Sequence, residues 1–188
     1  MKLEPFKTAV LTLDLQKGIL AMGDGYESII PNASKIVGLA RKKNYQLIHV
    51  GLGFSEGHPE VADLDTPFLK AKQNNLFVKG SPSAEFHGAI VQPGDLIIYK
   101  QRIGAFSENH LNLTLRARGI ENLVFFGIST SGIVLATVTR AFDLDFKITI
   151  IHDACLDADA EVHRVLTEKI FPKRGTVATT DSFISEQV

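Results

Sequence analysis

The sequence predicts a doubly wound α/β fold of three layers, in which a parallel sheet carries helices on both faces. Two observations predict it. Short runs of strand-forming residues alternate along the chain with segments of helical periodicity, an order that is typical of parallel sheets. The runs are apolar throughout, as expected of strands that are buried on both faces.

The first half of the chain contains two expected strands. Residues 8–15, TAVLTLDL, predict a buried strand, and residues 45–54, YQLIHVGLGF, predict a second. Between them, residues 32–43 have apolar side chains at helical spacing. The segment 55–94 is irregular and rich in proline, with a short helical candidate at 68–73. We expect this long segment to cover or line a site.

The second half of the chain continues the alternation. Helix 131–142 is apolar almost all round, so we expect it to be buried. No linker or internal repeat interrupts the pattern, which predicts one domain over residues 1–188. The expected strands are residues 95–100, 121–127, 146–153 and 175–180, and the expected helices are residues 109–118, 131–142 and 160–171.

Composition excludes several classes of function. The chain has 20 basic and 21 acidic residues, and this balance gives no electrostatic footprint for nucleic acid or an anionic membrane. No apolar stretch approaches the roughly 20 residues that span a bilayer, and Asp14 cuts off the first apolar run, so we expect a cytoplasmic protein. The single cysteine, Cys155, excludes an intrachain disulfide and a Cys-rich zinc site.

Polar side chains follow the expected strands at their carboxyl ends, where ligands bind in this kind of fold. The first strand ends with Asp14 and Gln16, and the third ends with Lys100 and Arg102. A buried aspartate that faces a lysine can act as a general acid or base, because burial and charge pairing shift its pKa in opposite directions. The fourth strand leads into the turn 127–132, GISTSG, whose backbone N–H groups at a helix start can hold an anion.

Several of these residues also have a purely structural interpretation. The hydroxyls of Ser129, Thr130 and Ser131 are more often helix N-caps than nucleophiles. Arg102 is either a bidentate clamp for a substrate carboxylate or a surface charge. Phe106 is either part of a pocket wall or part of the core.

Four stretches combine these residues: LTLDLQKG, YKQRIGAF, GISTSGIVLATVTRAFDLDF and IIHDAC. In order and spacing they resemble the isochorismatase-like hydrolase family, also called the cysteine hydrolases, across nearly the whole chain. The resemblance implies a Rossmann-like sheet of six parallel strands with helices on both faces. It also implies a non-proline cis peptide near Ile128-Ser129 that shapes an oxyanion hole, and assembly into homodimers or homotetramers.

The resemblance further implies a catalytic triad of aspartate, lysine and cysteine, in which Asp14 and Lys100 are the first two members. The third falls at Ile133, and isoleucine cannot attack a carbonyl. Cys155 lies past the fifth strand and does not match the family's position. His49 lacks the neighbouring ligand of the family's metal-binding branch, so we expect no metal ion and no cofactor.

Isochorismatases proper do not need a thiol, because they hydrolyse a vinyl ether by protonating its methylene carbon. We therefore expect a hydrolase for a small carboxylated molecule, with Asp14 as the acid and no covalent thioester step. Two requirements conflict here. The charge of Lys100 lowers the pKa of Asp14, whereas acid catalysis needs that pKa to be raised. The alternatives are a non-catalytic member that binds a small ligand or a protein partner, and a hydrolase that uses Ser131 or Thr130. The residues expected to contact the substrate are Gln16, Arg102, Phe106, Ser129, Thr130, Ser131 and Gly132.

Overall fold

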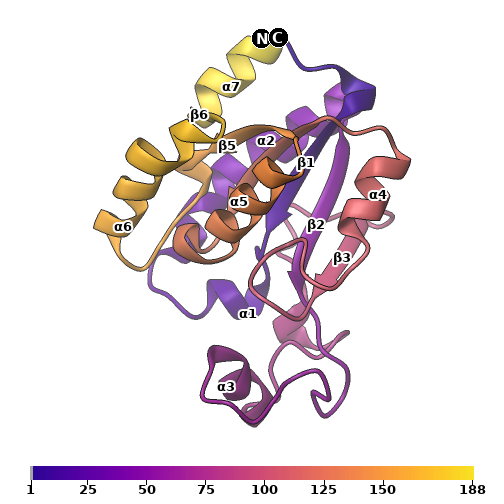
Figure 1. Ribbon diagram of the computed structural model, residues 1–188, viewed down its shortest axis with the longest axis vertical. Coiled ribbons are helices and arrows are strands. Elements are labelled where there is room, and N and C mark those ends of the chain that lie inside the picture. Colours follow the sequence, from indigo (N-terminus) through magenta and orange to yellow (C-terminus); the bar gives the residue numbers. More distant parts are fainter. Residues whose placement is uncertain (1) are drawn as a thin grey trace.

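Residues 2–188, the part of the chain that the computed structural model describes, form a parallel sheet between layers of helices (Figure 1). Its six strands lie in the order β3-β2-β1-β4-β5-β6. The chain starts in the middle of the sheet, moves outward to β3 and then crosses to β4, so the strand order reverses between β1 and β4. This arrangement confirms the predicted fold class. The strands are β1 (Thr8–Leu13), β2 (Gln46–Leu52), β3 (Leu96–Lys100), β4 (Asn122–Gly127), β5 (Lys147–Ile151) and β6 (Thr176–Ala178).

The helices cover both faces of this sheet, with α5 in front and α2 behind in the view of Figure 1. Two short helices, α1 and α7, were not expected from the sequence. The helices are α1 (Lys17–Leu20), α2 (Ile30–Lys43), α3 (Pro67–Gln73), α4 (Leu111–Ala117), α5 (Leu135–Asp143), α6 (Ala160–Val165) and α7 (Thr180–Gln187).

The segment predicted as one buried helix over residues 131–142 differs from that expectation. It begins with a π turn over Thr130–Val134, in which Gly132 leaves helical geometry at φ −93° and ψ −105°. Only one face of α5 is buried, and Phe142 on its other side is 49% exposed. The expectation of burial all round was therefore wrong, because the apolar residues of this helix exceed what the sheet covers.

The core lies along the central strands, and every residue of β1 and β4 is buried. A smaller apolar cluster joins the end of β2 to the segment 55–94 through Leu52, Phe54, Val61, Ala71 and Phe77. This cluster anchors the irregular segment, including α3, beyond the carboxyl ends of β2 and β3 (Figure 1). The predicted excursion therefore lies at the edge where ligands bind in such folds.

Gly127 allows the ends of β1 and β4 to approach closely. Its φ is +148°, and a Cβ atom on it would lie 1.9 Å from the carbonyl oxygen of Leu13. The same carbonyl accepts a hydrogen bond of 3.1 Å from the backbone N–H of Ile128. The turn after β4 is thus fixed against the end of β1, directly before Asp14.

A buried polar chain connects β1, β2, α2 and the start of β3. The His49 ring, which is fully buried, contacts Thr12 Oγ1 at 2.7 Å through Nδ1 and Asp95 Oδ2 at 3.1 Å through Nε2. Arg41 Nη2 donates to the same Asp95 oxygen at 2.5 Å. Burial lowers the pKa of His49, and the hydrogen bond to Asp95 opposes this shift.

We expect the free energy of unfolding to decrease as pH falls from about 8 to about 5. The pKa of His49 is depressed in the folded state below its ordinary value of 6.5, so the unfolded chain binds the proton more readily. The contribution of His49 is present above that ordinary value and is lost below it, with a slope of up to about 1.4 kcal/mol per pH unit. Urea unfolding over this range measures the slope.

The variant His49→Gln should flatten the slope, whereas His110→Gln, at an exposed histidine, should leave it unchanged. Equal slopes for the wild type and His49→Gln would contradict this account.

Candidate active site

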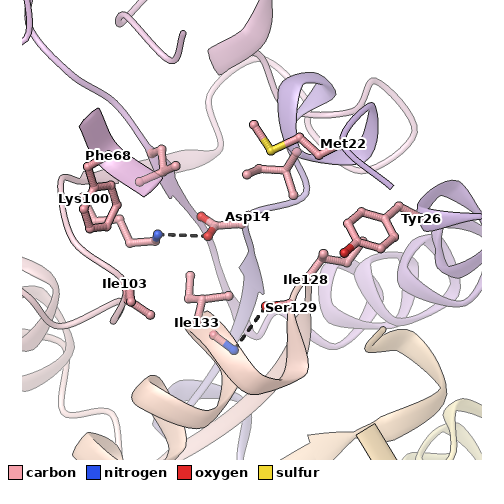
Figure 2. Close-up of a pocket in the computed structure, with 12 residues that line it drawn as sticks. Asp14, Met22, Tyr26, Phe68, Lys100, Ile103, Ile128, Ser129 and Ile133 are labelled. Carbon is pink, nitrogen blue, oxygen red and sulfur yellow. Dashed lines mark hydrogen bonds and ion pairs between the residues drawn. The ribbon is translucent and has the colours of Figure 1, made fainter. Parts of the chain in front are cut away.

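A cavity of about 280 Å³ opens at the carboxyl ends of β1 and β3 (Figure 2). Most of its walls are apolar, and they come from α1, the segment after it, α3, the loop after β3 and the turn after β4. Two of its lining residues carry a charge, and they carry opposite charges. The lining residues are Asp14, Ile19, Met22, Tyr26, Leu52, Phe68, Lys100, Ile103, Ile128, Ser129, Gly132 and Ile133.

The two charged side chains form a buried ion pair. Lys100 Nζ lies 2.9 Å from Asp14 Oδ2, and the two side chains are 1% and 8% exposed. Lys100 Nζ also donates to the carbonyl oxygen of Arg102 at 3.1 Å. The other oxygen, Asp14 Oδ1, has no hydrogen-bond partner among residues 2–188. Within the described chain, one carboxylate oxygen of the pair therefore has no donor, and one of the three ammonium N–H groups has no acceptor.

The backbone of Asp14 adopts the left-handed conformation, with φ at +55°. Its N–H donates to the carbonyl of Val50 at 2.8 Å, so β2 holds the residue that follows β1. Aspartate tolerates this conformation better than most residues. Because of this conformation, the carboxylate leaves the alternating up-and-down pattern of strand side chains and points toward Lys100, as Figure 2 shows.

Burial raises the pKa of the Asp14 carboxyl above its ordinary value, and the charge of Lys100 reduces this rise. The enclosing apolar walls therefore outweigh the neighbouring cation. A carboxyl group with a raised pKa is suited to donate a proton near neutral pH. The direction of this shift is the one that an acid catalyst needs.

The turn after β4 contains the expected non-proline cis peptide, between Ile128 and Ser129. Three of its backbone donors are engaged within the protein. The N–H of Thr130 donates to Leu156 O at 3.0 Å, and that of Ser131 donates to a carboxylate oxygen of Asp157 at 2.6 Å.

The next N–H, that of Gly132, donates to Ser129 Oγ at 3.1 Å, the bond drawn in Figure 2. The backbone of residues 129–133 was expected to hold an anion, and three of its amides, those of residues 130–132, have an intramolecular acceptor in this arrangement.

Residue 133 lies beside the ion pair and carries no reactive group. The Ile133 side chain is 2% exposed and lines the cavity between Lys100 and the turn (Figure 2). Cys155 does not line the cavity, and burial raises the pKa of its thiol to about 12. A thiol with that pKa remains protonated, and therefore weakly nucleophilic, at neutral pH.

Two residues expected to contact the substrate instead hold loops together. The side-chain amide of Gln16 is fully buried, donates to the carbonyls of Leu52 and Ala84, and accepts from the N–H of Leu52. It ties the end of β2 to the excursion. The guanidinium of Arg102 donates to the carbonyls of Gln101 and Glu60.

Arg102 also lies over the ring of Phe68, 5.9 Å from its centre, and so supports a cavity wall from outside. Three further expected contacts lie outside the cavity lining. Phe106 stacks on Phe146, Thr130 Oγ1 bonds His163 Nδ1 at 2.8 Å, and Ser131 is exposed.

Most of the apolar lining could not be predicted from the sequence residue by residue. Ile19 lies in the short helix α1, Met22 in the turn after it, and Tyr26 at the start of a 3-10 turn. Ile103 lies within YKQRIGAF but was not singled out as a site residue. Phe68 was within reach of prediction, because it opens the helical candidate in the segment expected to cover a site.

Among the described residues, no group of three or more His, Cys, Asp or Glu side chains is placed to hold a metal ion. Within residues 2–188, no helix has the length and apolarity that crossing a membrane requires.

Comparison with known proteins identifies relatives along nearly the whole chain. The isochorismatase domain family matches residues 8–182. The uncharacterized isochorismatase family protein YwoC of Bacillus subtilis is 36% identical, over 96% of this chain and 94% of its own. The ureidoacrylate amidohydrolase RutB of Acinetobacter baylyi is 30% identical, over 98% of this chain and 85% of its own.

Solved structures share the fold at lower identity. A cysteine hydrolase from Pseudomonas syringae superimposes with a TM-score of 0.89 at 21% identity, covering 100% of this chain and 95% of its own. The N-carbamoylsarcosine amidase of Thermoplasma acidophilum has a TM-score of 0.76 at 20% identity, covering 93% and 97%.

We expect the native protein to resist iodoacetamide at about pH 8, because its one thiol is buried and protonated. Intact-mass spectrometry should show no adduct on the folded wild type and one adduct after denaturation. The variant Ile133→Cys should gain one adduct in the folded state, because its thiol would lie beside the Lys100 cation. Rapid alkylation of the folded wild type would contradict the buried position of Cys155.

Proposed function

The chain belongs to the isochorismatase family of hydrolases, and from this premise we propose that it cleaves a small carboxylated molecule without a thioester intermediate. The observation that carries the proposal is the composition of one cavity. A buried carboxylate and ammonium face each other there, while residue 133, where the family resemblance places the nucleophile, is isoleucine. The chain's single thiol lies outside that cavity.

The reaction that suits this cavity is hydrolysis of an enol ether. Asp14 gives its proton to the terminal methylene carbon, and the C=C electron pair forms the new C–H bond. The resulting cation is stabilised by the ether oxygen and by the Asp14 carboxylate left behind. Water adds to the cation and returns a proton to Asp14. The hemiketal then breaks its C–O bond to the former ether oxygen, giving pyruvate and an alcohol.

The geometry around Asp14 supports its role as the acid. Asp14 Oδ1 has no hydrogen-bond partner in the described part of the chain, so it is available to carry the proton and to face a substrate carbon. Apolar walls raise the pKa of the carboxyl, and the same walls exclude bulk water from a cation. Lys100 holds the other oxygen and stabilises the carboxylate once the proton has left.

A second candidate function is ligand binding without catalysis. It is favoured by the engaged N–H groups of residues 130–132, which leave a tetrahedral oxyanion without those donors. The relatives named as amidohydrolases make amides the obvious competing substrates. One panel of substrates distinguishes ligand binding and amide hydrolysis from enol ether hydrolysis.

We expect the protein to release pyruvate from isochorismate and no ammonia from ureidoacrylate or N-carbamoylsarcosine. Asp14→Asn should lower kcat/KM for isochorismate by about 10²–10⁴-fold, the usual contribution of a positioned general acid. Cys155→Ala serves as the matched control and should leave the rate unchanged. Coupled assays for pyruvate and ammonia, with thermal unfolding of each variant, make the measurement.

Other outcomes identify the alternatives. Ammonia release from an amide, abolished by Ser131→Ala or Thr130→Ala, would instead indicate a hydroxyl nucleophile. Saturable binding of isochorismate without any product would indicate the non-catalytic role.

A further inference from the structure

Residues 2–188 give the cavity no uncompensated positive charge for a carboxylated ligand. Asp14 and Lys100 are its two charged lining residues, and each neutralises the other at 2.9 Å. Arg102, the obvious clamp for a carboxylate, directs its guanidinium to the carbonyls of Gln101 and Glu60. An anion that enters this cavity must therefore compete with Asp14 for Lys100.

The geometry of the pair allows such an exchange. An ammonium group has three N–H donors, and Lys100 uses two of them within the described chain, toward Asp14 Oδ2 and Arg102 O. A ligand carboxylate that accepts the third would lie next to the Asp14 carboxylate. Two carboxylates at such a distance in a desolvated cavity cannot both remain ionised, and a shared site holds them with one proton between them.

We propose that this cavity binds a carboxylate together with one proton, which is placed on Asp14. The inference rests on the proposed function to the extent that it assumes a carboxylated ligand. In the binding step the ligand replaces Asp14 as the counter-ion of Lys100, a proton from solvent forms an O–H bond on Asp14, and no bond to carbon changes. The net charge of the cavity stays the same before and after binding.

The surroundings of the pair assign the proton to Asp14. The side chains that α1, α3, the loop after β3 and the turn after β4 contribute to the lining have no titratable group. Tyr26 is the other titratable residue of the lining, and burial together with the nearby Asp157 raises its pKa, which keeps it neutral. Arg102 lies outside the lining and does not neutralise the incoming charge, and Glu60, also outside it, is not placed to take the proton.

Binding and catalysis are connected by this exchange. The arrival of the substrate carboxylate places on Asp14 the proton that protonation of an enol ether consumes. Ligands that carry a carboxylate are accordingly favoured, while neutral amides gain nothing from the exchange.

Benzoate is a suitable probe, because it is a small apolar monoanion that cannot be hydrolysed. Titration calorimetry in phosphate and in Tris should show uptake of one proton per benzoate bound. The dissociation constant should rise about tenfold per pH unit between about pH 6 and about pH 8, as linkage to one proton requires. The neutral isostere benzamide should bind weakly, without proton uptake and without pH dependence.

Two variants separate the roles of the pair. Asp14→Asn, which suits the left-handed backbone at this position, should bind benzoate without proton uptake and with a dissociation constant that does not change with pH. Lys100→Met should lose benzoate binding, with thermal unfolding confirming that it is folded.

The proton count on the wild type decides the matter even if a variant does not fold. Benzoate binding without proton uptake, no benzoate binding at all, or proton uptake that persists in Asp14→Asn would overturn the inference. Pyruvate release from isochorismate is measured separately, so the proposed hydrolysis would survive that result. Conversely, proton-linked benzoate binding by a protein that releases no pyruvate would sustain the inference and reject the hydrolysis.

Discussion

The ion pair between Asp14 and Lys100 is the interaction on which the rest of the site depends. Removing two charges from water costs on the order of several kcal/mol for each ion, and their attraction recovers this cost only when the geometry is good. Here the pair has one short contact, one carbonyl acceptor for the lysine and a carboxylate oxygen with no partner in the described chain. An arrangement so incompletely satisfied is a poor device for stability. It fits the proposed binding of a carboxylate and a proton at this site.

The parallel sheet explains why these two residues meet. Asp14 follows β1 and Lys100 ends β3, with β2 lying between the two strands. Neighbouring strands are about 4.8 Å apart, so β1 and β3 are separated by roughly 10 Å. The long side chain of a lysine reaches across this separation, and the left-handed backbone of Asp14 turns its short side chain toward it. Strand order, side-chain length and one unusual backbone conformation thus act together.

The sequence predicted the fold and the charged pair better than it predicted the rest of the site. Buried parallel strands leave long apolar runs, and a carboxylate that ends such a run is conspicuous, so Asp14 and Lys100 could be placed at one edge. The directions of Gln16 and Arg102 could not be read in the same way. Each side chain donates hydrogen bonds to backbone carbonyl groups of nearby loops, and the positions of those carbonyls are known only from the folded structure. The missed helices α1 and α7 are short and carry little periodicity.

The reactions that this cavity can catalyse depend on whether it supplies a nucleophile or an acid. Acyl transfer through a covalent intermediate needs an electron pair from a nucleophile and N–H donors for an oxyanion. The cavity has isoleucine at residue 133, and the N–H groups of residues 130–132 already have acceptors. Protonation of an enol ether needs the opposite: an acid whose pKa is raised and, after the proton leaves, a negative charge beside a developing cation. A carboxyl group surrounded by apolar walls and steadied by one lysine meets both needs, because losing its proton creates the charge that stabilises the product of that loss.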